Sequence, residues 1–202
     1  FMIVANETVA ETIFFMELPF IYRIHDKPNP KKLQDVLKMF SVLGIQIKGN
    51  TDEFQPTMFK QALDQIEDKV SKRIVSDLIV ISLSKARYQE KNTGHFGLAS
   101  KNYTHFTSPI RRYPDLIVHR NLRKYLFDNK VEYKQFDLDE IHEIGIHTSE
   151  KEVSAIKAEQ TIEDMKKAEY MRQFIGEEFE VTIASILDYG FFVELENTVR
   201  GL

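Results

Sequence analysis

The sequence predicts an α+β protein in which helices dominate and a short β segment follows them. Apolar residues recur every three or four positions through most of the chain, as on the buried face of a helix. After Gly176 the pattern changes to alternating apolar and polar residues, which is typical of strands. The helical spacing covers residues 1–17, 31–43, 56–68, 71–88, 114–127 and 139–175.

Composition narrows the class of protein. The 202 residues are enough for one sizeable domain, or for one domain and part of another. There is no cysteine, which excludes a disulfide framework and fits a reducing cytoplasm. The formal net charge of −4 gives no overall basic field for a nucleic acid, so any such contact must be local. No stretch reaches the ~18 apolar residues of a membrane span, so we expect a cytoplasmic protein with no membrane partner.

The two ends of the chain suggest a fragment. The chain starts at Phe1 inside an apolar segment and stops after a strand-like run. The first residues lack the basic start of a signal peptide, and Asn6, Glu7 and Glu11 interrupt the apolar run. We therefore expect a piece of a longer protein.

The first helix is predicted to be amphipathic and to end before Pro19. Its expected buried face carries Met2, Val9, Ile13 and Met16. Asn6 lies at the edge of that face and is expected to bond to a neighbouring backbone group. An extended piece follows Pro19, and its isolated His25 is expected to be a hydrogen-bonded structural histidine.

Three further helices are predicted before residue 90. Pro30 begins the first and Gly44 ends it. After a polar connection at residues 45–55 come the helices at 56–68 and 71–88, the second ending in a basic patch at Lys85 and Arg87. That patch could meet RNA, although solvated charges at a helix end are the default interpretation.

Residues 94–120, GHFGLASKNYTHFTSPIRRYPDLIVHR, are the stretch richest in chemistry. Tyr103 to Thr107 favours an extended chain, and Pro114 fits the first turn of a helix. Asp115 complements the dipole of that helix. Arg111 and Arg112 then lie where an extended chain meets a helix N-terminus, an arrangement that suits a phosphate.

Two plainer interpretations of this stretch remain open on residue types alone. Paired arginines before a helix are often surface salt-bridge partners. Asp115 and His119 stand at positions i and i+4, so they could pair with each other.

The last part of the chain combines a long helix with strands. Glu159 borders the apolar seam of the helix at 139–175, where a solvated carboxylate is the plain interpretation; the seam is formed by Ile144, Thr148, Ala155, Ala158, Ile162 and Met165. After Gly176 the sequence predicts a strand, a D-Y-G hairpin or bulge, and a second strand. Tyr189 and Phe192 in this part could bind a ligand or fill a core.

The pattern T-S-P-I-R-R-Y-x-D-x-x-x-H, with H-F-G-L upstream, resembles the signature of the RNase II/RNase R exoribonuclease family, the RNB domain. The strings FMIVANETVAE, YRIHDKP and AEQTIEDMKKAEYM resemble other segments of that family, closest to its RNase R branch. The resemblance implies the C-terminal part of an RNB catalytic domain at 1–175. It implies the start of an OB-fold RNA-binding barrel of the ribosomal S-one type at 176–202.

The function implied by the resemblance is hydrolysis of single-stranded RNA from the 3′ end to nucleoside 5′-monophosphates. Arg111 matches the family position that stabilises charge on the scissile phosphate. The implied cofactor is Mg²⁺, whose cluster of aspartates is absent here and is expected before Phe1; the parent enzyme is expected to be monomeric. Gln160 stands where the family more often has Arg. Positions implied to contact RNA are Ser108, Arg112, Tyr113, Glu159, Tyr189 and Phe192. The alternative is a catalytically inactive relative that only binds RNA.

Overall fold

A computed structural model describes residues 1–47, 54–188, 190–195 and 199–201. The contacts divide the chain into two compact units, Phe1–Lys151 and Glu152–Leu202. The predicted domain boundary at Gly176 stays a prediction, because the division by contacts falls inside a helix.

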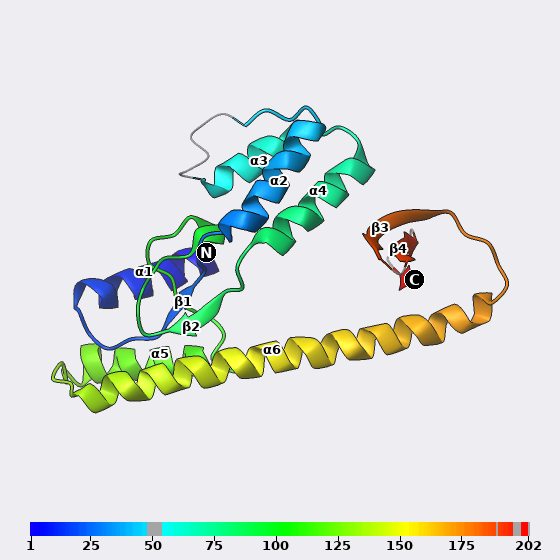
Figure 1. Ribbon diagram of the computed structural model, residues 1–202. Coiled ribbons are helices and arrows are strands. Elements are labelled where there is room, and N and C mark those ends of the chain that lie inside the picture. The colour runs from blue at the N-terminus through cyan, green and yellow to red at the C-terminus, as the bar shows by residue number, and fades with distance from the viewer. Residues whose placement is uncertain (48–53, 189, 196–198, 202) are drawn as a thin grey trace. The chain divides into compact units, whose positions relative to one another are not determined.

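The first unit mixes helices with a two-stranded sheet (Figure 1). Strands β1 and β2 are antiparallel, with Arg23 opposite Tyr88. The described elements of this unit are, in chain order, α1 (Met2–Phe15), β1 (Tyr22–Ile24), α2 (Pro30–Val42), α3 (Pro56–Asp64), α4 (Lys69–Ser82), β2 (Arg87–Gln89), the 3-10 helix η2 (Phe96–Leu98), α5 (Tyr113–Leu122), the π-helical turn η3 (Arg123–Phe127) and the first part of α6 (Gln135–Met171).

Helices α2, α3 and α4 lie side by side and form what we call the three-helix layer (Figure 1). Prolines occupy the first turns of α2 and α3, where the missing N–H costs nothing. The side chains of Asn29 and Asp68 accept hydrogen bonds from Lys31 N and Ser71 N and so cap α2 and α4. The core of the layer is apolar; it is formed by Val36, Phe40, Ile45, Phe54, Met58, Phe59, Ala62, Val75 and Ile79.

A second apolar cluster joins α1, the two strands, α5 and α6. Its fully or nearly buried members are Ala10, Ile13, Phe20, Ile21, Tyr22, Ile24, Tyr88, Ile117, Val118, Tyr125 and Ile141. We call this cluster, with the buried polar side chains around it, the signature core. The buried face of α1 is centred on Asn6, Ala10 and Ile13, whereas Met2, expected to be buried, is 67% exposed.

Helix α6 packs directly on β2. A side chain at Gly145 would bring its Cβ within 3.1 Å of the Tyr88 carbonyl oxygen, so glycine permits the close approach. The hydroxyl of Ser149 accepts a hydrogen bond from Tyr88 N at 2.9 Å. The helix thereby supplies an acceptor for a backbone donor of β2.

The prediction of helix through residue 88 was wrong. Helix α4 ends at Ser82, and residues 87–89 form β2. The intervening chain is held by long-range bonds: Ser84 O accepts from His25 Nε2, and Ser84 Oγ donates to Lys27 O. Burial of Tyr88 in the signature core then favours a strand over the helix that local apolar spacing predicted.

Other differences concern the ends of elements. The π-helical turn at 123–127 replaces the last part of the helix predicted at 114–127. Helix α6 begins at Gln135 rather than at the predicted residue 139, because Asp137 accepts from Lys134 N and Lys124 Nζ and fixes its first turn. From Ala155 onward the predicted seam of α6 is exposed in the part of the chain that the structure describes.

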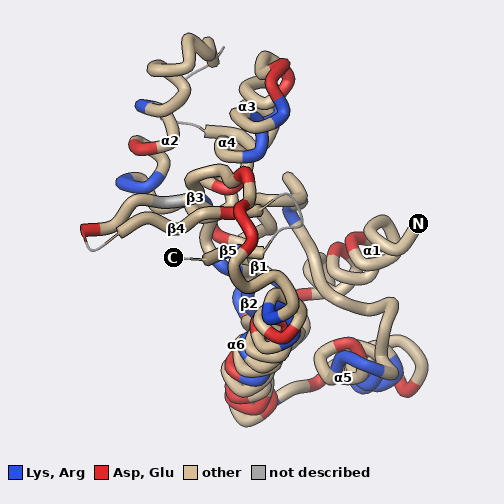
Figure 2. The backbone as a smooth tube through the Cα atoms, turned by 90° about the vertical axis from the view of Figure 1, so that its right-hand side faces the viewer, with Lys and Arg blue, Asp and Glu red and all other residues tan. Residues whose placement is uncertain are grey.

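The second unit holds the end of α6, the 3-10 helix η4 (Arg172–Phe174) and an antiparallel sheet in the order β3-β4-β5. Its strands are β3 (Val181–Leu187), β4 (Gly190–Leu195) and β5 (Arg200–Gly201), with an irregular register between Ile183 and Ser185. Acidic and basic residues are interspersed along α6 (Figure 2). None of the described helices is both long and apolar enough to span a membrane.

Candidate functional site

The segment Tyr103–Tyr113, which we call the signature segment, connects the strands to α5. Its first part runs beside β1: Arg23 N donates to Tyr103 O at 2.9 Å, and Thr104 Oγ1 donates to Ile21 O at 2.7 Å. The chain then turns, and Ser108 O accepts hydrogen bonds from the N–H groups of Arg111 and Arg112. Helix α5 starts at Tyr113, with Pro114 in its first turn, as the sequence predicted.

Asp115 is the buried centre of this turn. Its side chain is 0% exposed, and its Oδ2 accepts from Ser108 N at 2.7 Å and from Arg112 Nη2 at 2.8 Å. The alternative that Asp115 pairs with His119 is therefore wrong. His119 Nε2 instead donates to Phe106 O at 2.9 Å, and its ring stacks on the Phe106 ring.

The two neighbouring arginines have different surroundings. The Arg112 side chain is only 20% exposed and is bound to Asp115. Arg111 is exposed, and within the described ranges no hydrogen bond or ion pair engages its guanidinium group. The residues on either side of the pair, Ile110 and Tyr113, are also exposed. Arg111 therefore presents a fixed positive charge to solvent from a turn whose backbone is held.

Asn6 of α1 holds the other end of the signature segment. Its Oδ1 accepts from Phe106 N at 3.1 Å, and its Nδ2 donates to Tyr103 OH at 3.0 Å. The prediction that Asn6 bonds to a neighbouring backbone group was wrong, because its partners are about 100 residues away in sequence. Asn6 and His119 together satisfy both the N–H and the carbonyl of Phe106.

His25 is the hydrogen-bonded structural histidine that the sequence predicted. Its Nδ1 accepts from Gly97 N at 2.9 Å, so its Nε2 carries the hydrogen and donates to Ser84 O at 2.6 Å. A Cβ on residue 97 would lie 2.8 Å from Nδ1, which explains a glycine there. His25 thus links β1 to η2 and to the chain after α4.

A row of rings follows from His25 through His95, Tyr103 and His105 to Tyr88, with centroid separations of 5.1 to 5.8 Å. Burial, with the nearby positive charge of Arg23, lowers the pKa of His95 to about 4. Burial, followed by the charges of Arg112 and Arg23, lowers the pKa of His105 to about 3. Both rings are neutral at pH 7, and His105 Nδ1 is hydrogen-bonded to Tyr88 OH at 2.8 Å.

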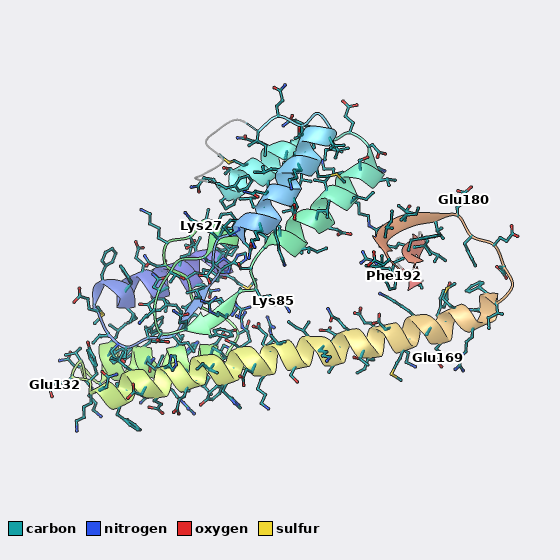
Figure 3. All side chains as sticks on the ribbon, viewed as in Figure 1. Lys27, Lys85, Glu132, Glu169, Glu180 and Phe192 are labelled. Carbon is teal, nitrogen blue, oxygen red and sulfur yellow. The ribbon has the colours of Figure 1, made fainter. Side chains whose placement is uncertain are left out.

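The remaining candidates belong to the second unit or lie outside the described residues. Glu159 is an exposed residue of α6. Phe192, which is labelled in Figure 3, is a partly buried residue of β4. Tyr189 lies outside the described residues. The structure thus brings together Ser108, Arg111, Arg112 and Tyr113 in one turn, with Asp115 beneath it.

The basic patch predicted at residues 85 and 87 is partly neutralised. Arg87 pairs with Asp26 and also donates to Gln89 Oε1, whereas Lys85 is exposed. This pairing favours the plain interpretation for Arg87, that of a surface charge.

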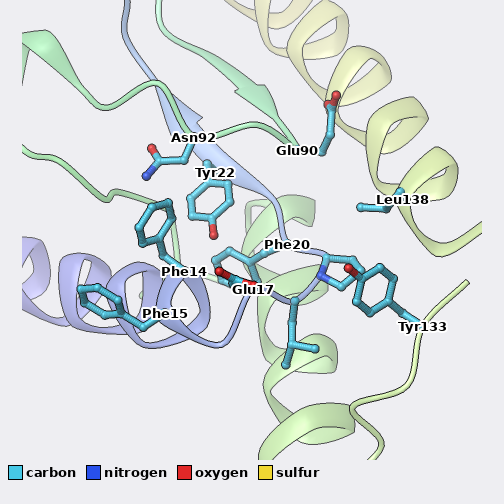
Figure 4. A pocket seen from close by; sticks show the side chains of 11 residues that line it. Phe14, Phe15, Glu17, Phe20, Tyr22, Glu90, Asn92, Tyr133 and Leu138 are labelled. Atoms are coloured by element: carbon cyan, nitrogen blue, oxygen red, sulfur yellow. The ribbon is translucent and has the colours of Figure 1, made fainter. Parts of the chain in front are cut away.

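An open pocket of about 330 Å³ lies between the end of α1, β1 and the start of α6 (Figure 4). Aromatic side chains of Phe14, Phe20, Tyr22 and Tyr133 line it together with the carboxylates of Glu17 and Glu90, among others. No residue of the signature segment lines this pocket. Carboxylates would repel a phosphate, so the candidate site is the exposed turn at Arg111 rather than this pocket.

The residues that the structure describes do not form a magnesium site. Over the described ranges, no group of three or more His, Asp or Glu side chains is arranged to hold a metal ion. What the signature segment offers is a cation, the Arg111 guanidinium, and the hydrogen bonds of Asp115 that hold its turn.

Comparison with known proteins identifies the family. Residues 1–128 match the RNB domain. Ribonuclease R 1 of Lactococcus lactis is 44% identical over 204 residues, covering 100% of this chain and 25% of that protein. Ribonuclease R of Escherichia coli is 32% identical, over 97% of this chain and 25% of that protein. The chain thus spans about a quarter of the length of these relatives.

Solved structures are also similar to this chain. Mycoplasma genitalium RNase R in complex with ribose-methylated single-stranded RNA is 32% identical, with a TM-score of 0.89 over 100% of this chain and 32% of that one. Yeast Ssd1, a pseudonuclease, has a TM-score of 0.78 over 96% of this chain and 24% of that one; at 22% identity it shares the fold alone. With the RNB match over residues 1–128 and ribonuclease R relatives along its whole length, the chain belongs to the RNB-domain family.

Proposed function

We propose that this chain is part of a 3′-to-5′ exoribonuclease that hydrolyses single-stranded RNA to nucleoside 5′-monophosphates, with Arg111 stabilising charge on the scissile phosphate. The main observation behind the proposal is that the Arg111 guanidinium is exposed on a turn held by the buried carboxylate of Asp115. The proposal is further supported by the match to the RNB domain and by the similarity to relatives named ribonuclease R.

The chemistry needs a cation at this place. Water adds to the phosphorus between the last two nucleotides, and the bond from phosphorus to the 3′ oxygen of the penultimate nucleotide breaks. Negative charge builds up on the phosphoryl oxygens as this occurs, and a preorganised donor stabilises it most at that stage. A guanidinium is always charged and can bond two oxygens at once, which suits Arg111 to the role.

The other positions are proposed as RNA contacts. Ser108 and the half-exposed Tyr113 flank the arginines, and Arg112 contributes mainly by orienting the turn, since it is bound to Asp115. Glu159, Tyr189 and Phe192 are proposed contacts of the second unit. We further propose residues 1–175 as the catalytic part and 176–202, whose described residues include an antiparallel sheet, as the start of an OB-fold barrel.

The cofactor and the setting are part of the same proposal. Mg²⁺ is the expected metal, with ligands supplied from outside these residues, and the enzyme is expected to act as a monomer in the cytoplasm. A catalytically inactive RNA-binding relative is the second candidate, and it would lack the metal ligands that the first candidate draws from outside these residues.

The test uses the full-length protein that contains this chain, with Mg²⁺ and single-stranded RNA labelled at its 5′ end. The expected result is stepwise shortening from the 3′ end and release of nucleoside 5′-monophosphates. Loss of one preorganised donor costs about 10²–10³-fold in rate, so Arg111→Ala is expected to lower turnover by roughly that factor. RNA affinity is expected to fall far less, because many contacts along the strand share it.

The controls separate the candidate functions. Arg111→Lys is expected to recover little, since a point charge lacks the bidentate fork. Arg120→Ala, which removes an exposed arginine of α5, is expected to leave turnover unchanged. RNA binding without shortening would support the inactive relative. A loss of affinity in proportion to rate, with turnover of bound RNA intact, would make Arg111 a binding contact only.

A further inference from the structure

We infer that Asp115 is the positioning residue for Arg111, acting through Ser108 and Arg112 rather than by touching RNA. The inference rests on the proposed function of Arg111 and assigns a separate role to the carboxylate beneath it. Asp115 is 0% exposed, so it makes no contact with a bound strand in this arrangement.

The geometry of the bonds is specific to the turn that carries Arg111. One oxygen, Asp115 Oδ2, receives both the backbone N–H of Ser108 and the guanidinium of Arg112. These two residues stand on either side of Ile110 and Arg111. Ser108 O in turn accepts the N–H groups of Arg111 and Arg112, so both ends of the short turn are tied to a single buried atom.

Burial makes these bonds strong and the carboxylate costly to hold. Hydrogen bonds to an ionised group in a low-dielectric interior are stronger than neutral ones. Yet Asp115 Oδ1 and Arg112 Nε are buried without a hydrogen-bond partner. Unsatisfied buried groups in a native structure need an explanation. Here both donors bind the same oxygen, Asp115 Oδ2, and this arrangement fixes the position of the turn that carries Arg111.

The signature segment is also fixed ahead of this turn. Asn6 accepts from Phe106 N, and His119 donates to Phe106 O, so the residue two positions before Ser108 is held on both backbone groups. The freedom that remains near Arg111 is therefore controlled mainly by Asp115. Misplacement of a catalytic group by about 1 Å can cost about 10²-fold in rate.

The experiment is a double-mutant cycle on turnover in the full-length protein. Asp115→Ala is expected to lower kcat about 10²-fold with KM changed less than threefold, the scale of a 1 Å misplacement. In an Arg111→Ala background the same change is expected to have almost no further effect, because a support for Arg111 is then irrelevant. Asp115→Asn, which keeps an acceptor for Ser108 N, is expected to recover part of the loss.

A matched control exists in the same unit. Asp137 accepts a lysine Nζ, from Lys124, and a backbone N–H, from Lys134, each at 2.8 Å, but it contacts no residue of the signature segment through these bonds. Asp137→Ala is expected to leave kcat unchanged. If Asp115→Ala does not fold, the cycle is run with Asp115→Asn, which has nearly the same volume.

The outcomes distinguish this inference from the function on which it rests. No nucleotide release by the unmodified protein, or no effect of Arg111→Ala, would overturn the proposed function. If both of those results are as expected, the double variant decides the inference. A loss of kcat in the double variant equal to the product of the two single losses would overturn it and make Asp115 a general structural residue. A rise in KM that accounts for the whole Asp115→Ala loss would do the same and indicate a binding role.

Discussion

The signature core and the three-helix layer are built differently, although both belong to the first unit. Among the residues that the structure describes, the signature core contains 11 buried apolar residues and the three-helix layer 9. The buried polar side chains Asn6, His25, Thr104 and Asp115 all lie in or beside the signature core. In the layer's described residues only Ser82 is a buried polar side chain, and it bonds to the carbonyl of Ile79 in its own helix.

The difference shows in which region of the first unit buried hydrogen bonds, which are directional, are concentrated. Apolar contacts are non-directional and stabilise without fixing one geometry closely. Buried hydrogen bonds require defined distances and angles, and an unmade one is costly. The signature core uses them on the segment that carries Arg111, whereas the three-helix layer is held by apolar packing.

The largest effect is expected from a cavity in the three-helix layer. Phe40 is 1% exposed at the centre of that cluster, and Phe→Ala changes in cores cost about 3–5 kcal/mol. Phe40→Ala is expected to reduce hydrogen-exchange protection strongly within residues 30–82. Protection of α1, β1 and α5 is expected to change little.

The control is Val42→Ala on the same helix, where the side chain is 81% exposed and little change is expected. Equal loss of protection in both regions after Phe40→Ala would contradict the comparison. It would show that the first unit unfolds as one cooperative body.

Local physics predicted much of the fold. Pro30, Pro114 and Asp115 gave the starts of two helices, because their preferences act within one turn. The change to strands after Gly176 followed from side-chain alternation. The predicted helix at 71–88 ran past the observed end of α4 at Ser82. The hydrogen bonds that hold Ser84 involve residues 25 and 27, and local spacing cannot show such partners.

The sequence placed two arginines at the turn before α5 but could not tell their surroundings apart. The motif singled out Arg111 and Arg112 together, and only the structure separates an exposed guanidinium from a buried one. Spacing pointed Asn6 and His119 to the wrong partners, because each bonds to Phe106 through a tertiary contact. Such partners depend on tertiary contacts, and periodicity reports only which face of an element is buried.

A smaller effect is expected from acid, and only in the signature core. His95 and His105 have pKa values of about 4 and about 3, against the ordinary value of 6.5. The unfolded chain therefore takes up protons below about pH 6.5 that the folded rings exclude. Their contribution to stability is present above that pH and is lost as the pH falls toward 4. The three-helix layer contains no histidine and is expected to keep its protection in this range.

The measurement is peptide-level hydrogen exchange at pH 7 and pH 4.5, corrected for intrinsic rates. His105→Gln keeps a hydrogen-bonding group beside Tyr88 OH and removes the titration, so it is expected to flatten the pH dependence. A layer that loses protection as steeply as the signature core would contradict the assignment. So would an unchanged slope in the variant.

The smallest effect is expected where a polar interaction of the signature core reaches the surface. Arg87 on β2 pairs with Asp26, which follows β1, but these side chains are 45% and 39% exposed. Solvent screens such a pair, so Arg87→Ala is expected to lower the free energy of unfolding by only about 0.2–1 kcal/mol. The loss should shrink further between 0.05 M and 1 M NaCl in urea unfolding of the 202-residue chain, since salt screens exposed charges. The Arg112–Asp115 pair, with exposures of 20% and 0%, should by contrast keep its effect at high salt. A salt-independent loss above about 2 kcal/mol at Arg87 would mean that burial does not decide which polar contacts hold this core.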